Sequence, residues 1–373
     1  MKTKITHLTS AHPRYDTRIF IKMCNSLAKK EDYKVSLVVA DGLGFENKNS
    51  IDIIDVGAKT GGRLSRMTTT VKKVFQKAKA LDSDIYHLHD PELIPIGLKL
   101  KKLGKKVIFD AHENIALQIK DKEYINYFLR HSISKIYRIY EKKVLHKFDA
   151  LILAEDSYNK YYSKLSNKII TVLNMPNIQD LNKFFSTNRD KNELFYIGGI
   201  SNNRGLDVSI EALKLLKIDF KDIYFHCIGG VDKHLIKSLD LKDIDNNIKF
   251  YGALPLFEGL KFSTHAKVGL SILKPIGNYT QSYSTKIFEY MAIGLPVITS
   301  DFQLYKDVIE KYECGICVNP VDVKEIANAI TYIINNHKEA QKMGENGRKA
   351  VEEKYNWEIE EQKLYKLYED LLK

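Results

Sequence analysis

The feature that most constrains the fold is an alternation of short apolar strands with helices, which occurs in two series along the 373 residues. The first series predicts strands at residues 4–10, 34–41, 51–57, 85–90, 106–113, 150–155 and 169–174, with helices at 17–29, 68–81 and 93–103. Strands that alternate with helices favour parallel sheets covered by helices on both faces. The first half is therefore expected to be a Rossmann-like α/β domain.

The second series follows a polar segment, residues 174–192, which contains Pro176 and is expected to connect two domains. It predicts strands at 193–200, 223–230, 247–253, 268–273, 296–300 and 315–320. A chain of this length usually exceeds one hydrophobic core. We predict an N-terminal domain over 1–175, a C-terminal domain over 176–355, and a helix over 356–373. That helix has an apolar face made of Trp357, Leu364, Leu367, Tyr368 and Leu371.

Composition places the chain among globular proteins, with 44% hydrophobic and 28% charged residues. No run of about 18 apolar residues occurs, and the N-terminus has no apolar signal-peptide region, so a cytoplasmic location is expected. The cysteines Cys24, Cys227, Cys314 and Cys317 are too scattered for a disulfide framework. The spacing of Cys314 and Cys317 is that of a redox pair, but the surrounding pattern favours buried thiols.

The net charge of +11 is unevenly distributed. Residues 1–173 hold 32 Lys and Arg against 19 Asp and Glu, or +13, and the remainder holds 26 against 28, or −2. Within the basic half, residues 129–148 predict an amphipathic helix with Leu129, Ile133, Ile136, Tyr140, Val144 and Phe148 on one face. Such a helix either packs on its own domain or adheres to an anionic membrane surface. No nucleic-acid-binding module accompanies the charge.

Polar side chains follow two strands of the first series, at the strand edge where parallel sheets bind ligands. His87, His89 and Asp90 end one strand, and Asp110 and His112 end the next. The spacing of His89, Asp90 and His112 matches no strong metal-ligand pattern, so no metal is expected. Hydrogen bonds to a sugar or an acceptor hydroxyl are the favoured role for these groups.

In the second half, FYIGGISNNRGLDVSIEAL predicts a strand, a glycine-rich turn and a helix, with Arg204 in the turn. Glycines let the backbone approach a ligand, helix N-termini favour anions, and a guanidinium grips phosphate oxygens. A second helix start follows Gln281, with Ser284 as its expected N-cap and Glu289 about one turn further in. A carboxylate there can accept hydrogen bonds from ribose hydroxyls. The pattern indicates a nucleoside diphosphate site.

These pieces together resemble a retaining family 4 glycosyltransferase of the GT-B type. The segment from Pro275 to Asp301, with STKIFEYMAIGLPVITSD, is similar to the family's donor-binding segment, and YIGGISNNRG, HLHDPEL, FDAHEN and the terminal YNWE support it. The resemblance implies two Rossmann-like domains whose parallel sheets face a cleft, with the last helix crossing back to the N-terminal domain. It also implies transfer of a sugar from a nucleotide sugar, with a UDP-sugar favoured, and no metal or other cofactor.

The resemblance also assigns roles to residues. Catalytic roles fall to His112, Arg204, Gln281 and Glu289, and donor binding to Gly199, Arg204, Ser282, Tyr283, Ser284, Thr285, Lys286 and Glu289. Two departures from the family pattern stand out. Gln281 replaces the first acid of the family's pair of acids, and Gly199 stands where many relatives have an arginine, which leaves the diphosphate to Arg204, Lys286 and helix N-termini.

The acceptor side is expected to involve Asp16, Arg18, His89 and Asp90. Family resemblance and the basic N-terminal half together imply a lipid-linked saccharide acceptor at the inner face of a bacterial membrane, as in O-antigen or capsule synthesis, and a peripheral protein. Two alternatives of similar fold remain open. A nucleotide-sugar epimerase would change the sugar without an acceptor, and a non-catalytic partner subunit would turn over no donor.

Overall fold

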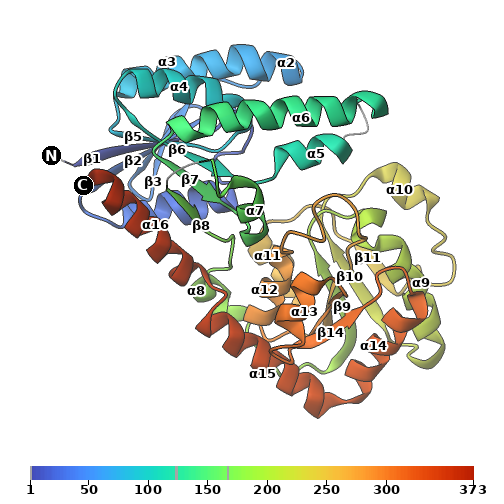
Figure 1. Cartoon of the computed structure of the whole chain (residues 1–373). Coiled ribbons are helices and arrows are strands. Elements are labelled where there is room, and N and C mark those ends of the chain that lie inside the picture. The colour runs from blue at the N-terminus through green and yellow to red at the C-terminus, as the bar shows by residue number, and fades with distance from the viewer. Residues whose placement is uncertain (1, 122–124, 166–167) are drawn as a thin grey trace. The chain divides into compact units, whose positions relative to one another are not determined.

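The computed structural model describes residues 2–121, 125–165 and 168–373 (Figure 1). The chain divides into two compact units, Met1–Asn174 with Trp357–Lys373, and Met175–Asn356. Each junction lies one residue from the predicted position, because Met175 and Asn356 belong to the second unit. The two units are described separately below as the N-terminal unit and the C-terminal unit.

The N-terminal unit contains a sheet in the order β3-β4-β2-β1-β5-β6-β7-β8, whose strands pair in parallel except β3 with β4. The strands are β1 (Thr3–Leu8), β2 (Tyr33–Val39), β3 (Glu46–Lys48), β4 (Ile51–Asp55), β5 (Ile85–Leu88), β6 (Lys106–Ala111), β7 (Ala150–Leu153) and β8 (Ile169–Thr171). All seven predicted strands are confirmed. The sequence did not predict β3, a short polar edge strand with no apolar run to mark it.

The helices of this unit are η1 (Thr17–Cys24), α1 (Asn25–Ala28), α2 (Arg63–Ser65), η2 (Arg66–Thr70), α3 (Val71–Leu81), η3 (Pro91–Leu93), α4 (Ile94–Lys102), α5 (Ile115–Asp121), α6 (Tyr127–Val144), η4 (Leu145–Lys147), η5 (Asp156–Tyr158), α7 (Asn159–Tyr162) and α16 (Trp357–Leu372). Helices η1, α1 and α16 cover one face of the sheet. Helices α3 and α4 and the end of α6 cover the other. The three helices predicted in this half are confirmed.

The terminal helix α16 packs onto the N-terminal unit, as predicted (Figure 1). Trp357 donates its indole N–H to Ser26 Oγ at 2.8 Å, and Glu361 lies 3.5 Å from the Lys29 ammonium. Tyr368 is buried and hydrogen-bonds His87 at 2.8 Å. The five apolar residues predicted for its face are all buried.

The amphipathic helix near residue 130 exists as α6, but its predicted packed face is only partly correct. Val144 and Phe148 are buried, whereas Leu129, Ile133 and Ile136 expose 54%, 37% and 66% of their surface. The N-terminal half of α6 extends beyond the sheet it would pack against (Figure 1). Periodicity fixes which residues share a face, but not whether another element covers that face.

The C-terminal unit contains a parallel sheet in the order β11-β10-β9-β12-β13-β14. Its strands are β9 (Lys191–Ile197), β10 (Tyr224–Ile228), β11 (Ile248–Phe250), β12 (Ala266–Ser271), β13 (Val297–Ser300) and β14 (Gly315–Val318). These are the six strands that the sequence predicted.

The helices of the C-terminal unit are α8 (Ile178–Leu181), η6 (Asn182–Phe184), η7 (Asn202–Arg204), α9 (Leu206–Asp219), α10 (Lys233–Ser238), α11 (Leu256–Leu260), η8 (Lys261–Ser263), α12 (Thr285–Ala292), α13 (Gln303–Ile309), α14 (Val323–Asn335) and α15 (His337–Glu353). Helices α9 and α14 pack on one face of the sheet, and α12 packs against α15.

Asn174, the first residue of the predicted connection, belongs to the N-terminal unit. The rest of that segment, residues 175–192, is part of the C-terminal unit and contains α8, η6 and the start of β9. Its anchor is Arg189, whose buried guanidinium donates to the carbonyl oxygens of Ser186, Ser263 and Ile293. Burial lowers the pKa of Arg189 to about 10. An arginine that satisfies several backbone carbonyls fixes a polar segment without an apolar pattern.

The four cysteines are free thiols, and all except the half-buried Cys317 are buried. Burial raises the pKa of Cys314 and of Cys317 to about 12, which opposes thiolate chemistry. None of the helices in the described parts of the chain combines the length and apolar character needed to cross a bilayer.

Candidate functional site

The glycine-rich turn of the C-terminal unit lies at the carboxyl end of β9. Gly198 has φ +133°, and its N–H donates to the carbonyl of Ile228 at 2.9 Å. Gly205, which begins α9, has φ +76° and approaches the carbonyl oxygen of Ile272 so closely that a Cβ would lie 2.4 Å from it. Glycine is therefore required at both positions. Between them, Gly199 is exposed and Arg204 is half-buried.

A second element of the same unit, the start of α12, contributes to this region. Ser284 occupies the N-cap position as predicted, but its hydroxyl bonds Ser271 Oγ at 3.0 Å and forms no cap hydrogen bond. The first-turn amide groups are thus not used by that side chain. Free amide groups at the start of a helix favour an anion. Gln281, Ser282, Tyr283 and Thr285 are half-buried around this helix start.

The turn and the helix bring two cations into one region. Lys286 is 5% exposed, and its ammonium lies 4.9 Å from the centroid of the Tyr196 ring. Arg204 lies against the ring of Tyr279, with its guanidinium carbon 5.7 Å from the ring centroid, and also hydrogen-bonds Tyr196. Burial, followed by repulsion from Arg204, lowers the pKa of Lys286 to about 7, and attraction from Glu289 opposes this shift.

Glu289 is half-buried on α12, where the three residues before it and the four after it are buried. Its charge acts on Lys286, which places it in the same electrostatic region as Arg204. The structure therefore assembles most of the predicted donor residues around one turn and one helix start. The helix ends at Ala292, and Gly294, with φ +71°, reverses the chain before β13.

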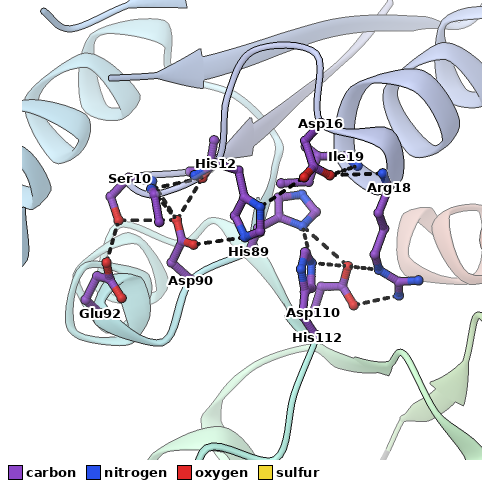
Figure 2. A network of polar contacts seen from close by, with 12 residues as sticks. Ser10, His12, Asp16, Arg18, Ile19, His89, Asp90, Glu92, Asp110 and His112 are labelled. Carbon is purple, nitrogen blue, oxygen red and sulfur yellow. Dashed lines mark hydrogen bonds and ion pairs between the residues drawn. The ribbon is translucent and has the colours of Figure 1, made fainter. Parts of the chain in front are cut away.

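The N-terminal unit holds a separate polar network of histidines and acids (Figure 2). His112 Nε2 lies 3.0 Å from Asp110 Oδ2 and 3.2 Å from His89 Nδ1. Arg18 donates two hydrogen bonds to Asp110, at 2.8 and 2.9 Å, and a third to the carbonyl of Val172. His89 continues inward to His7 at 2.8 Å. The network joins five residues from separate elements: His7 of β1, Arg18 of η1, Asp110 of β6, His89 just after β5 and His112 just after β6.

Charge within this network is concentrated on Arg18 and Asp110. Despite burial, attraction from Arg18 and His112 holds the pKa of Asp110 well below its usual range. Burial lowers the pKa of His89 to about 4, so this imidazole is neutral. Arg18, His89 and Asp90, predicted to bind an acceptor, are 5%, 2% and 3% exposed and have internal partners.

Asp90 closes the loop after β1. Its Oδ2 accepts hydrogen bonds from the Thr9 hydroxyl at 2.8 Å and from the Ser10 amide at 2.6 Å. Asp16 is half-buried, accepts from the backbone amides of Arg18 and Ile19, and so caps η1. Of the four predicted acceptor residues, only Asp16 retains partial exposure.

His12 is a polar residue of this region that sequence reasoning missed. Its Nδ1 lies 3.0 Å from Asp16 Oδ2, its Nε2 lies 3.4 Å from Asp90 Oδ1, and its ring centroid lies 5.1 Å from that of His112 (Figure 2). Although burial opposes charging, the Asp16 hydrogen bond and three nearby carboxylates raise the pKa of His12. The available signal was its position, four residues after the end of β1 and four residues before Asp16.

Within the described residues, two sets of side chains have possible ligand atoms close enough together to hold a metal ion. One set is His7, His87 and His89, and the other is His89, Asp110 and His112. The rings of His7 and His89 are stacked, with planes 12° apart, and share a direct hydrogen bond. Asp110 is engaged by the Arg18 guanidinium through both oxygens. This geometry fits a hydrogen-bonded polar network better than a set of ligands pointing at one ion.

Two units with parallel sheets, one with a glycine-rich turn beside a helix start, have the architecture of the GT-B fold. Comparison of the whole fold agrees. A sucrose-phosphate synthase from Thermosynechococcus elongatus matches with a TM-score of 0.76 at 17% identity, over 100% of this chain and 99% of that one. HepE from Anabaena, in complex with UDP and glucose, matches with a TM-score of 0.72 at 12% identity, over 99% and 100%.

Sequence comparison identifies the family. "Glycosyltransferase Family 4" matches residues 17–172, and "Glycosyl transferases group 1" matches residues 177–350. The chain belongs to the group 1, family 4 glycosyltransferases.

Curated relatives are distant. The capsular polysaccharide biosynthesis glycosyltransferase CapM of Staphylococcus aureus is 24% identical over 51% of this chain and 49% of CapM. The uncharacterized glycosyltransferase MJ1069 of Methanocaldococcus jannaschii is 22% identical over 74% and 71% of the two chains. The match spans about half the length of CapM, so it supports the family more strongly than any particular substrate.

Proposed function

We propose that the protein is a retaining hexosyl- or N-acetylhexosaminyltransferase that uses a nucleotide sugar, with a UDP-sugar favoured, and needs no metal. The observation that carries this proposal is the convergence of Arg204, Lys286 and the uncapped start of α12 beside Glu289. Two cations and helix amides can stabilise a leaving diphosphate. The UDP found in HepE supports the choice of nucleotide.

In the proposed reaction, the oxygen of an acceptor hydroxyl bonds to the anomeric carbon while the bond from that carbon to the diphosphate breaks. The acceptor approaches on the face that the diphosphate leaves, so the anomeric configuration is kept. The leaving phosphate oxygen takes the hydroxyl proton, and no protein base is required. Glu289 holds the ribose, and Ser282, Tyr283, Ser284 and Thr285 line the phosphates and sugar with Gly199.

Gln281 is proposed to hydrogen-bond hydroxyl groups of the donor sugar. Its amide offers one acceptor oxygen and two donor hydrogens in nearly the volume of a glutamate, but without the charge. Sugar binding can therefore be preserved while electrostatic support for a cationic sugar is reduced.

His112 is proposed to contact the transferred sugar, held in orientation by Asp110, which lies 3.0 Å away. The buried Arg18, His89 and Asp90 are better suited to positioning neighbouring side chains than to contacting the acceptor. We therefore propose that Asp16 and His12 contact the acceptor. Both of these side chains are partly exposed at the edge of the sheet, at 21% and 29%. A carboxylate paired with an imidazole can hydrogen-bond a saccharide hydroxyl.

The acceptor is proposed to be a lipid-linked saccharide of polysaccharide synthesis, in line with the name of CapM as a capsular polysaccharide biosynthesis glycosyltransferase. Helix α6 supports a peripheral position on the inner face of a membrane. It exposes Phe128 and Ile136 at 85% and 66%, and it carries Arg130, Lys135, Lys142 and Lys143 against Glu141. Exposed apolar side chains flanked by cations bind anionic lipid surfaces.

A donor panel tests the proposal. The wild-type protein, with EDTA present, is supplied with UDP- and GDP-sugars and a lipid extract, and nucleoside diphosphate release and the anomeric configuration of the product are measured by NMR. The proposal expects acceptor-dependent release with retained configuration. A changed free sugar without acceptor would indicate an epimerase. The absence of turnover, even though a nucleotide sugar binds, would indicate a non-catalytic subunit.

A further inference from the structure

Lys286 is a buried lysine on α12, with 5% of its surface exposed. It forms no ion pair within the described residues. Its Nζ instead lies 3.5 Å from Ser284 Oγ and 4.9 Å from the centroid of the Tyr196 ring. A buried ammonium without a carboxylate partner is costly, and this cost favours the neutral amine.

The charges around Lys286 strengthen this preference. The nearest cation is Arg204 on η7, which repels a second positive charge, and Glu289 on α12 attracts it. Burial and Arg204 together lower the pKa of Lys286 to about 7, so the empty site holds about half an ammonium at neutral pH. Tyr196, from β9, has its pKa raised to about 12, and Cys227 has its pKa raised well above the usual value.

The turn that Lys286 approaches has no side chain of its own at Gly199. A Cβ on Gly199 would meet no atom within 4 Å, so a larger side chain has room there. Lys286 instead reaches the same turn from α12, since a Cβ on the adjacent Gly198 would lie 3.6 Å from its Nζ. The second cation of this region thus comes from a lysine on α12 and not from a side chain at position 199. An arginine cannot lose its proton near neutral pH, whereas a buried lysine can.

We propose that binding of the donor diphosphate takes up one proton at Lys286, so that the site gains its second cation only when the anion arrives. This inference rests on the proposed donor site. The proton comes from solvent and remains on Nζ, where the phosphate oxygens stabilise it. The free site is spared a buried second cation beside the half-buried Arg204, and the occupied site has both cations.

The sign of the pH dependence follows from this linkage. Diphosphate raises the pKa of Lys286 from its value in the empty site, so complex formation binds a proton above pH 7 and does not below it. Donor affinity is therefore constant below neutral pH. Above it, affinity falls by up to about tenfold for each pH unit until the pKa of the complex is reached.

Calorimetric titration with UDP at pH 8.0 tests the inference, using two buffers that differ in ionisation enthalpy. The wild type is expected to take up about 0.9 proton per UDP bound, given a free-site pKa near 7. The terminal phosphate of UDP contributes almost nothing at this pH, because its second pKa is about 6. Over pH 7.5 to 8.5, the wild-type Kd is expected to rise roughly eightfold.

Two variants locate the proton. Lys286→Arg, which stays charged, is expected to bind UDP with no proton uptake and a Kd independent of pH over this range. Lys267→Met is the matched control, because Lys267 is also 5% exposed but donates to Asn192 Oδ1 at 2.9 Å and lies at the start of β12. Its proton uptake should equal that of the wild type.

The outcomes separate the inference from the proposed function. UDP binding with no proton uptake and a flat pH profile in the wild type would overturn the inference while leaving the donor site intact. Uptake that persists in Lys286→Arg would overturn it as well. If neither UDP nor GDP binds at any pH, the proposed function fails, and this inference fails with it.

Discussion

The polar region of the N-terminal unit and that of the C-terminal unit use their charged groups in opposite ways. In the N-terminal unit, Arg18 and Asp110 expose 5% and 0% of their side chains and satisfy each other. In the C-terminal unit, Arg204 and Glu289 are half-buried, Gly199 is exposed, and Lys286 has no carboxylate partner among the described residues. A network that satisfies itself holds neighbouring groups in position, whereas a cation without an ion-pair partner beside a helix start favours an anion.

The largest expected effect comes from breaking the satisfied network. Asp110→Ala leaves Arg18 buried without its partner, and loss of one member of a buried ion pair costs about 3–5 kcal/mol of folding stability. Urea unfolding of the variant should show a correspondingly lower midpoint. Thermal unfolding gives a second readout, and a Tm of the variant within 1 °C of the wild-type Tm would contradict the structural role given to this pair.

A somewhat smaller effect is expected from the C-terminal region, and it should appear in activity rather than in folding. Arg204→Ala removes one stabiliser of the leaving diphosphate, and loss of one such group lowers kcat by about 10²–10³-fold. Its Tm should stay near that of the wild type because Arg204 is not part of a buried ion pair. Turnover of the best donor of the panel measures this. An unchanged kcat would remove Arg204 from the reaction.

Asp16 should give a pH-dependent effect on stability. Its pKa is lowered to about 2 despite burial, mainly through the hydrogen bond with His12 and that of the Ile19 amide. A depressed folded-state pKa contributes stability above the unfolded value, near 4, and the contribution is lost as pH falls from about 4 to 2.

Asp16→Asn should therefore lower stability by about 2 kcal/mol at pH 7, since the favoured charge is lost while an asparagine can still cap the helix. The difference from wild type should vanish near pH 2, as followed by urea unfolding across pH. A difference that persists unchanged at pH 2 would show that the charge of Asp16 is not its source.

The smallest effect on stability is expected on α6. Ile136→Ser replaces a side chain that is 66% exposed, and surface changes usually stay within about 0.5 kcal/mol. Binding to vesicles with anionic lipid should nevertheless weaken several-fold, because the apolar contact is lost. The control must also change a surface residue, so the buried Ile333 on α14 is not suitable. Tyr332→Ser, 46% exposed on α14, is suitable and should leave sedimentation with vesicles unchanged.

Much of the fold could be predicted because its signals are local in sequence. Apolar runs marked thirteen strands. The glycine-rich turn before α9 and the start of α12 can each be recognised within a single stretch of about twenty residues. The residues predicted to bind the donor, Arg204 and Glu289 among them, lie around one turn and one helix start for the same reason, and their roles stay predictions.

The features that were missed depend on distant partners. Arg18 pairs with Asp110 ninety-two positions away, and this pairing favours a positioning role over the predicted acceptor contact. His12 gained significance from Asp16, four residues away, and through the fold from Asp90 and His112. The segment 174–192 is held by Arg189 through backbone carbonyls, which carry no sequence signal. The exposed face of α6 depends on what lies beside it, which periodicity does not report.

The most direct test of the contrast between the two regions is the thermal shift produced by UDP, without metal, in three proteins. Ligand binding raises the Tm by mass action. The account predicts a shift in the wild type and in Asp110→Asn, whose own Tm is lower, and no shift in Glu289→Ala. A shift retained by Glu289→Ala but lost in Asp110→Asn would contradict the assignment of the donor to the C-terminal region.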